Sequence, residues 1–215
     1  MVINRKGQSS KKLFSDLVII KVSPKEITAY DSAMYPIPLW IKTFRQKHTL
    51  GWNFMYGVKH TKSKYLMRVD ADDDFHPCYK VSYGLNILRF RSDIKAVSPF
   101  YEIFYNNPDN AGNYTVLNVV TRPQGAGIIY DREAFMDVGG YNSFLKYQSD
   151  LDFYIKFTNK YTMGLYPAIY GWRYKDNGSI KHKDDILILR KEILKKYNKM
   201  DNDVHHFGMY AYYGG

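Results

Sequence analysis

Residues 65–73 read Tyr65-Leu66-Met67-Arg68-Val69-Asp70-Ala71-Asp72-Asp73. The first five residues are mostly apolar, and this short run predicts a strand that ends directly at Asp70. Residues two apart in an extended chain point to the same side, so the carboxylates of Asp70 and Asp72 can converge. Such a pair is typical of Mg²⁺ or Mn²⁺ shared with substrate phosphates. We therefore expect a metal site at the carboxyl end of this strand, where open α/β sheets bind ligands.

Two simpler explanations of the acidic cluster were weighed against a metal site. An exposed acidic turn accounts for many Asp-rich tetrapeptides, but here four aspartates directly follow an apolar strand. A calcium loop of the EF-hand type requires Gly at its sixth position and Glu at its twelfth. Counted from Asp70, these positions hold Phe75 and Val81. The calcium loop is excluded, and the acidic turn stays open as the weaker interpretation.

The pattern before Asp70 predicts an α/β fold with a mostly parallel, Rossmann-like central sheet flanked by helices. A β-branched strand at 17–22 and a helix at 52–61 precede the strand at 65–69, and shorter pieces are expected at 1–4, 8–14 and 36–41. Beyond Pro77 the elements are expected to be mixed. Helices are predicted directly after Pro77 and at 131–138, 150–159 and 183–199, with strands at 94–97, 101–105 and 114–120. Ser149 is expected to cap the helix at 150–159, with Asp152 completing a variant capping box.

Composition restricts the class of protein. The chain has 215 residues, 45% of them hydrophobic, which suits one sizeable domain. The single cysteine, Cys78, excludes an internal disulfide and favours a cytoplasmic location. No long apolar run predicts a transmembrane helix, and the first residues lack the apolar region of a signal peptide. The formal net charge of +10 favours an anionic partner and is compatible with peripheral membrane contact. The 21 tyrosines suit sugar rings or nucleobases, although core packing explains any single one better.

Four segments together resemble the GT-A glycosyltransferases, particularly the large inverting family 2. Residues 65–73 with Pro77 resemble the D-x-D segment of that family, and 127–141 resembles its strand, helix and Gly-Gly-aromatic turn. Ser149-Asp150-Leu151-Asp152-Phe153 resembles the Glu-Asp-x-Asp helix start, and 170–179 resembles the late aromatic-Arg segment. The resemblance covers roughly residues 50–182. It implies one GT-A domain over 1–215, with a nucleotide-binding half at about 1–75, an acceptor-binding half at about 76–200 and a tail or linker at 201–215.

The resemblance also implies a function: transfer of a sugar from a nucleoside-diphosphate sugar, with UDP favoured, to a glycan hydroxyl with inversion. By resemblance, Asp70 and Asp72 bind Mn²⁺ or Mg²⁺, and His182 is the best-placed late histidine to complete the metal shell. Asp150 would be the general base, with Asp152 as the competing carboxylate. Donor contacts would fall at Asn4, Arg5, Ser23, Asp70, Ala71, Asp72 and Arg173.

The chain departs from the family pattern at several positions. Ser149 replaces the usual Glu, Lys21 to Pro24 replace an acidic pair, and Met55-Tyr56-Gly57 replace Ala-Arg-Asn. The short first strand and the aromatic tail resemble a catalytic domain cut from a longer multidomain glycosyltransferase of the chlorovirus type, which would act in the host cytoplasm.

Two other functions stay open at this point. A sugar-phosphate nucleotidyltransferase would share the sheet and the acidic cluster, but it requires a Gly-rich phosphate loop that Gly7-Gln8-Ser9-Ser10 matches poorly. A nucleic-acid-binding module would suit the charge, but no RNP-like, zinc or helix-turn-helix signature is present. It also leaves the aspartates unexplained, because carboxylates repel phosphate unless a metal intervenes. We therefore expect no nucleic-acid partner.

Overall fold

A computed structural model of the chain describes most of the central sheet and the helices around it. Its backbone is described for residues 17–22, 27–31, 49–70, 74–75, 78–106, 114–120, 125–174, 183–200 and 209–210. Side chains are described for residue 20 and for 49–69, 81–99, 125–166 and 184–200. The pieces expected at 1–4, 8–14 and 36–41 lie outside these residues.

Within the described residues, nine strands form one sheet in the order β2-β1-β3-β7-β5-β8-β4, with β6 beside β5 and β9 beside β8. The strands are β1 (Leu17–Val22), β2 (Ile27–Asp31), β3 (Tyr65–Asp70), β4 (Asp74–Phe75), β5 (Ile94–Asn106), β6 (Tyr114–Val120), β7 (Ile129–Asp131), β8 (Thr162–Tyr174) and β9 (Met209–Tyr210). The predicted strands at 17–22, 65–69 and 114–120 are confirmed, and those at 94–97 and 101–105 are parts of one long strand.

The sheet is mixed, so the expectation of a mostly parallel sheet is wrong. β1 and β3 are parallel, as are β5 and β8 and also β8 and β9. However, β7 runs antiparallel to both of its neighbours, β3 and β5. The reason is that the chain leaves along β5 and returns beside it, first as β6 and then as β7. Such a return needs only a turn, whereas a parallel neighbour needs a long crossover.

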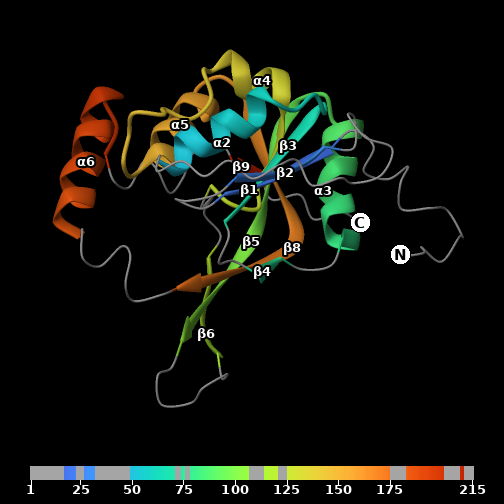
Figure 1. The fold of residues 1–215 in the computed structure, drawn as a ribbon, viewed down its shortest axis with the longest axis horizontal. Helices are drawn as coiled ribbons and strands as arrows, with labels where there is room; N and C mark the ends of the chain where they lie inside the picture. Colours follow the sequence, from blue (N-terminus) through green and yellow to red (C-terminus); the bar gives the residue numbers. More distant parts are fainter. Residues whose placement is uncertain are drawn as a thin grey trace, which may run out of the picture.

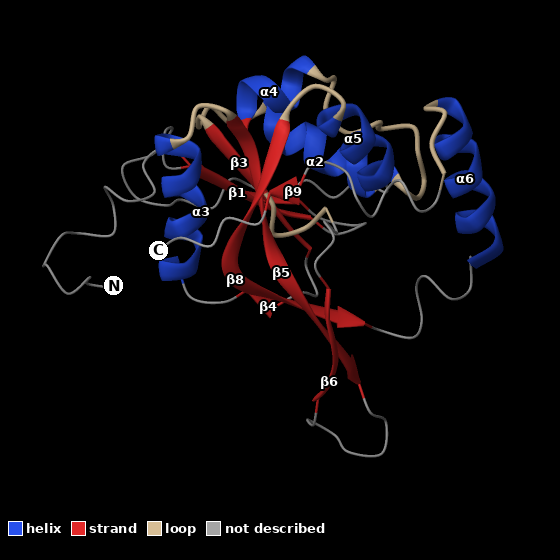
Figure 2. Ribbon diagram, turned by 180° about the vertical axis from the view of Figure 1, so that it is seen from behind, coloured by secondary structure: helices blue, strands red, loops and turns tan. Residues whose placement is uncertain are grey.

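Five helices in the described part of the chain cover the sheet on both faces (Figures 1 and 2). They are α2 (Leu50–Lys59), α3 (Cys78–Phe90), α4 (Arg132–Asp137), α5 (Ser149–Thr158) and α6 (Lys183–Lys196). α3 lies on one side of the sheet, while α2, α4 and α5 gather on the other, and α6 lies outside α5 (Figure 1). This arrangement confirms the α/β class. None of the helices in the described residues is long and apolar enough to cross a membrane.

β3 is buried on both faces, as the apolar run at 65–69 predicts. Leu66 packs into an aromatic cluster that α2, α4 and α5 supply. Its neighbours Tyr65, Met67 and Val69 pack into a second cluster beneath α3. The alternation follows from the period of two along a strand. β3 is therefore fixed between two cores, and its carboxyl end has a well-defined place.

The start of α5 differs from the predicted capping box. The helix begins at Ser149, and Gln148 is the N-cap residue, with a left-handed φ of 58° and no side-chain capping bond. Ser149 is buried against α2 instead, where its Cβ and Oγ would lie 3.3 Å from a Cβ added to Gly51. This tight contact removes the Ser149 hydroxyl from the capping position.

Arg132 joins the end of β7 to the connection between α2 and β3. Its guanidinium donates to the carbonyl oxygens of Ser63 at 2.5 Å and Val58 at 2.8 Å. It also donates to the hydroxyl of Thr61 at 2.8 Å. These three bonds connect the start of α4 to the loop between α2 and β3, and they help to fix the point at which β3 begins.

Replacing Arg132 should therefore weaken the fold measurably. We expect Arg132→Met to lower the free energy of unfolding by about 1–3 kcal/mol, because it removes three hydrogen bonds made by a partly buried guanidinium. Urea unfolding at pH 7 measures this loss. The matched control is Arg91→Met, because Arg91 pairs with Asp93 on the surface at 2.8 Å and should contribute less than about 1 kcal/mol. Equal losses for the two variants would contradict the role given to Arg132.

Candidate functional site

The acidic cluster begins where predicted, at the end of a central strand. β3 ends at Asp70, whose register partner is Val22 at the end of the parallel strand β1. Both strands therefore end at the same edge of the sheet. The side chain of Asp70 lies outside the described residues, as do Ala71 and Asp72 and the donor-site candidates Asn4, Arg5 and Ser23.

The backbone brings the late aromatic-Arg segment to this region. β4 begins at Asp74, the last aspartate of the acidic cluster, and pairs antiparallel with β8, with Asp74 opposite Gly171. Arg173 stands two residues further along β8, opposite Phe104 of β5. Two strand positions span about 7 Å. The backbone positions of Asp74 and Arg173 are therefore close, whereas the side chain of Arg173 and the whole of His182 lie outside the described residues.

Asp150 lies in the first turn of α5 and is partly exposed. Its Oδ1 accepts a hydrogen bond from the Leu151 N–H at 2.9 Å. The positive end of the helix dipole stabilises a carboxylate at this place. A Cβ added to Gly125 would lie 2.9 Å from the Asp150 Cβ and 3.3 Å from its Oδ2. The carboxylate is thus held by its own helix on one side and by the Gly125 loop on the other.

Arg68 is the buried cation of β3 and also lies close to Gly125. Only 4% of its surface is exposed. Its Nη1 would lie 3.2 Å from a Cβ added to Gly125, and its guanidinium lies 5.5 Å from the ring centre of Tyr141. The backbone takes part as well, because the Gly127 N–H donates to the Arg68 carbonyl at 2.8 Å. Arg68 and Asp150 therefore meet at Gly125, although 82 positions separate them in the sequence.

Two tyrosine hydroxyls fix the loop that holds these groups. The Tyr141 hydroxyl donates to the Gly125 carbonyl at 3.3 Å, and the Tyr166 hydroxyl donates to the Gly127 carbonyl at 3.2 Å. Gly125 and Gly127 both have left-handed backbone angles, with φ of 84° and 76°. Sequence reasoning missed this loop and Arg68. The signal that could have revealed Arg68 was a charged residue in an apolar strand expected to be buried on both faces.

Asp152 has a different environment from Asp150. It is 1% exposed, and its Oδ1 accepts from Lys196 at 3.0 Å and from the Tyr197 hydroxyl at 2.8 Å. Lys156 faces its Oδ2 at 3.3 Å and also donates to the Gly140 carbonyl at 2.9 Å. Burial by itself would raise the pKa of Asp152, but the hydrogen bonds from Lys196 and Tyr197 and the nearby lysine charges hold it below its ordinary value. This carboxylate joins α5 to α6.

The described residues do not by themselves form a metal site. Among them, no three His, Cys, Asp or Glu side chains are grouped to hold an ion. The predicted ligands Asp70, Asp72 and His182 are not among the described side chains, so their grouping stays a prediction. Comparison with models of known protein families gives no match, and comparison with curated proteins gives none either.

A side chain at position 125 should lower the free energy of unfolding more than a side chain at another glycine with similar backbone angles. In Gly125→Ala the new Cβ would meet Asp150 at 2.9 Å in addition to the strain of a left-handed backbone, and overpacking typically costs 1–3 kcal/mol. Gly139→Ala is the matched control, because Gly139 has nearly the same φ, 85°, and nothing within 4 Å of the added Cβ. Its cost should be the backbone strain of about 1–2 kcal/mol. Urea unfolding compares the two, and a smaller loss for Gly125→Ala would contradict the close approach described here.

The buried Asp152 should make stability depend on acidity. Its pKa is lower in the folded chain than its ordinary value of 3.8, so its stabilisation is fully present above that value and is lost as the pH falls through the folded pKa. We expect wild-type protein to lose more stability than Asp152→Asn between pH 5 and about pH 3. Thermal unfolding across this range measures the difference. Parallel curves for the two proteins would show that the carboxylate is not held in the charged form.

Proposed function

We propose that the chain is a metal-dependent, inverting glycosyltransferase that uses a nucleoside-diphosphate sugar, with UDP favoured, and a glycan acceptor. The observation that carries the proposal is that Asp150 and Arg68 both lie close to Gly125. Arg68 belongs to β3, and this strand ends two residues after Arg68, at Asp70. A partly exposed carboxylate thus lies close to the strand end that carries the acidic cluster. Sugar transfer needs both a base for the acceptor and a site for the diphosphate, in one place.

Asp150 is the base in this proposal. Its Oδ1 is held by the Leu151 N–H in the first turn of α5, and its side chain is partly exposed. The carboxylate takes the proton of an acceptor hydroxyl as the hydroxyl oxygen forms a bond to the anomeric carbon. The bond from that carbon to the diphosphate breaks in the same displacement, and the configuration inverts. A positioned base typically contributes 10²–10⁴-fold to such a step.

Asp152 is assigned a structural role, although it lies only two residues from Asp150. Its carboxylate is buried beneath Lys156, Lys196 and Tyr197, and its pKa is lowered, which makes it a weak proton acceptor. An acceptor sugar would have to displace these donors to reach it. The choice between the two carboxylates therefore falls on Asp150.

The metal of the proposal would be held by Asp70 and Asp72, with His182 as a third ligand. This donor set is rich in carboxylate oxygen and fits Mn²⁺ or Mg²⁺. When bound, the ion neutralises the charge that develops on the departing diphosphate. The Arg173 position in β8 would place a second cation near the same phosphates.

The test separates donor binding from chemistry. Binding of UDP, GDP and dTDP is measured by calorimetry with Mn²⁺ and with EDTA, and we expect the preferred nucleotide to need the metal in wild type but not to respond to it in Asp72→Ala. Transfer is then measured with Asp150→Asn, which keeps the shape of the side chain. Nucleotide affinity should be unchanged, while turnover falls by about 10²- to 10⁴-fold.

Asp152→Asn serves as the comparison in the same assay. It should lose stability while keeping most of its turnover per folded molecule. A dead Asp152→Asn beside an active Asp150→Asn would show that the roles are reversed. Equal nucleotide affinity with Mn²⁺ and EDTA, or a product of retained configuration, would overturn the proposed function.

A further inference from the structure

The large apolar side chains that the described residues expose are concentrated in one region. Seven are exposed in all, and four of them belong to α6, to the turn after it or to the loop packed against it. These four are Phe144 (97% exposed), Leu187 (44%), Ile188 (58%) and Met200 (72%). Leu145 places the loop of Phe144 beside α6, because it packs against the apolar cluster between α5 and α6. Exposed apolar side chains gathered in this way are typical of an interaction surface, whereas single ones need no explanation.

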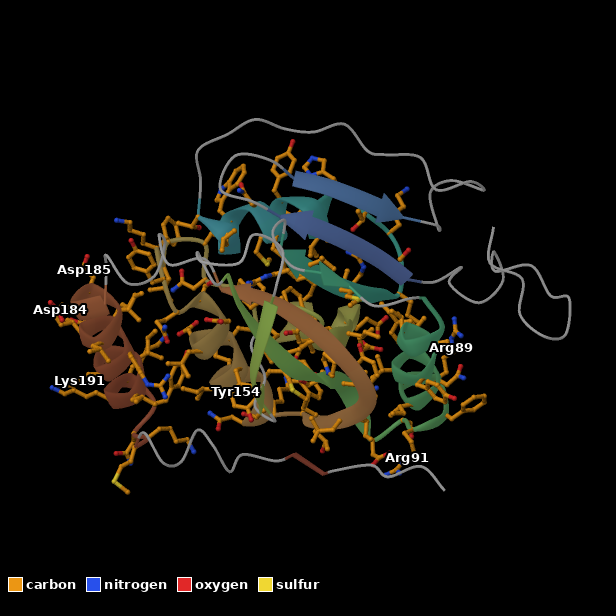
Figure 3. All side chains as sticks on the ribbon, turned by 90° about the horizontal axis from the view of Figure 1, so that it is seen from below. Arg89, Arg91, Tyr154, Asp184, Asp185 and Lys191 are labelled. Carbon is orange, nitrogen blue, oxygen red and sulfur yellow. The ribbon has the colours of Figure 1, made fainter. Side chains whose placement is uncertain are left out.

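The register of α6 separates an inner side from an outer side. Ile193 and Leu194 are buried against α5 and mark the inner side. Ile188 lies five residues before Ile193, which places it about 140° away around the helix axis. Lys191 and Lys195 follow Ile188 by three and seven residues and therefore share its side. α6 lies at the outer edge of the molecule, and Lys191 points away from it (Figures 1 and 3).

The two lysines on the outer side are available to an anionic partner. Both are exposed, and among the described side chains neither forms an ion pair. They stand four residues apart, where like charges on a helix repel each other. Asp184 and Asp185 lie in the first turn, where the helix dipole favours them, and the later turns of α6 are mainly basic. Negative charge outside the molecule would relieve the repulsion between the lysines.

Phe144 is exposed on a turn whose backbone is held by hydrogen bonds. Its N–H donates to the Asn142 Oδ1 at 3.1 Å, and the Leu145 N–H donates to the Asn142 carbonyl at 3.3 Å. The Thr49 hydroxyl donates to the Ser143 carbonyl at 3.0 Å. These bonds fix the backbone on both sides of the ring, so the ring is exposed as part of the folded structure. The loop therefore adds an aromatic group to the apolar residues of α6.

We propose that this region binds the surface of a membrane that contains anionic phospholipid. The residues involved, the α6 surface, are Phe144, Leu187, Ile188, Lys191 and Lys195. Their apolar side chains can enter the boundary between headgroups and acyl chains, while the long lysine stems let the ammonium groups stay at the lipid phosphates. The formal net charge of +10 attracts the whole chain to the same anionic surface.

Two other partners fit these residues less well. The centre of a protein interface is usually depleted of lysine, whereas here two lysines share the outer side of α6 with Ile188. A nucleic acid would engage the lysines through its phosphates, but aliphatic side chains contribute little to such contacts. The combination of aliphatic, aromatic and lysine side chains therefore favours lipid. The inference goes beyond the proposed sugar transfer and does not depend on it.

The first experiment measures sedimentation of the whole chain with vesicles, in the absence of donor and acceptor. We expect binding to phosphatidylcholine vesicles with about one quarter phosphatidylserine, little binding to phosphatidylcholine alone, and release at high salt. Lys191→Gln combined with Lys195→Gln should weaken binding by about 10- to 30-fold, because both favourable interactions with the anionic lipid are lost.

The matched control for charge is Lys59→Gln combined with Lys64→Gln. These exposed lysines lie at the end of α2 and just before β3, outside the α6 surface. The control removes the same charge and should weaken binding by less than about threefold, through the net charge alone. Equal losses in the two pairs would overturn the assignment, as would the absence of wild-type binding to the anionic vesicles.

The apolar side chains are tested separately. Leu187→Gln combined with Ile188→Gln keeps the charge and should weaken vesicle binding by about 10-fold. Glutamine is favourable in helices, so α6 should remain folded; if the pair melts well below wild type, Ile188→Gln alone is used. Tyr83→Gln combined with Phe90→Gln is the control on α3, across the sheet, and should bind like wild type. Undiminished binding without Leu187 and Ile188 would overturn the proposal, because it would show a general site for anions.

The second experiment tests the part given to the loop. In Phe144→Trp, the added indole should shift its fluorescence to shorter wavelength when anionic vesicles are present, because it leaves water for the lipid boundary. Phe90→Trp on α3 is the control and should show no shift of its added indole, while the three native tryptophans contribute equally to both proteins. A shift in neither variant, or an equal shift in both, would overturn the role of Phe144 in the α6 surface.

Discussion

The candidate site depends on one close contact, the packing of residues 125–127 against the end of β3. The Gly127 N–H bonds to the Arg68 carbonyl, and a Cβ added to Gly125 would lie 3.2 Å from the Arg68 guanidinium and 2.9 Å from the Asp150 Cβ. Both glycines have backbone angles that other residues adopt only at a cost. A side chain at position 125 would require its surroundings to shift, because the added Cβ would lie 2.9 Å from the Asp150 Cβ. The close approach of the start of α5 to the Gly125 loop therefore depends on the absence of one side chain.

Two carboxylates in one helix turn illustrate how position decides chemical role. Asp150 is partly exposed and is bonded to its own helix, whereas Asp152 is buried beneath donors from α5 and α6. A buried carboxylate with three such partners is held charged and has little affinity for a proton. The same contacts fasten α6 to α5 together with the apolar pairing of Leu151 and Ile155 with Ile193 and Leu194. The acidic residues Asp184 and Asp185 lie at the far end of α6, and Lys191 points away from the molecule (Figure 3).

The tyrosines of the described region serve mainly the core. Tyr65, Tyr130 and Tyr166 are almost completely buried, and Tyr130 forms edge contacts with Phe153 and Phe157. Burial also raises the pKa of Tyr154 in α5 to about 12. Tyr141 and Tyr166 do more than fill space, because their hydroxyls hold the loop beside β3. This combination of an apolar ring and a polar end suits a buried loop whose carbonyl groups need donors.

The sequence by itself determined the α/β class, the strand that ends at Asp70 and the helix that begins near Asp150, because apolar periodicity and turn residues are local properties of the chain. The stop of α4 at Gly139 and Gly140 was likewise visible in advance, and both residues have left-handed angles. Only the tertiary structure decided that β7 runs antiparallel between β3 and β5, and that Ser149 packs against Gly51 instead of capping α5. It also brought Arg68 and Asp150 close to Gly125, although the three residues belong to segments far apart along the chain. Such contacts depend on how closely backbones approach in three dimensions, and no periodicity in the sequence records that distance.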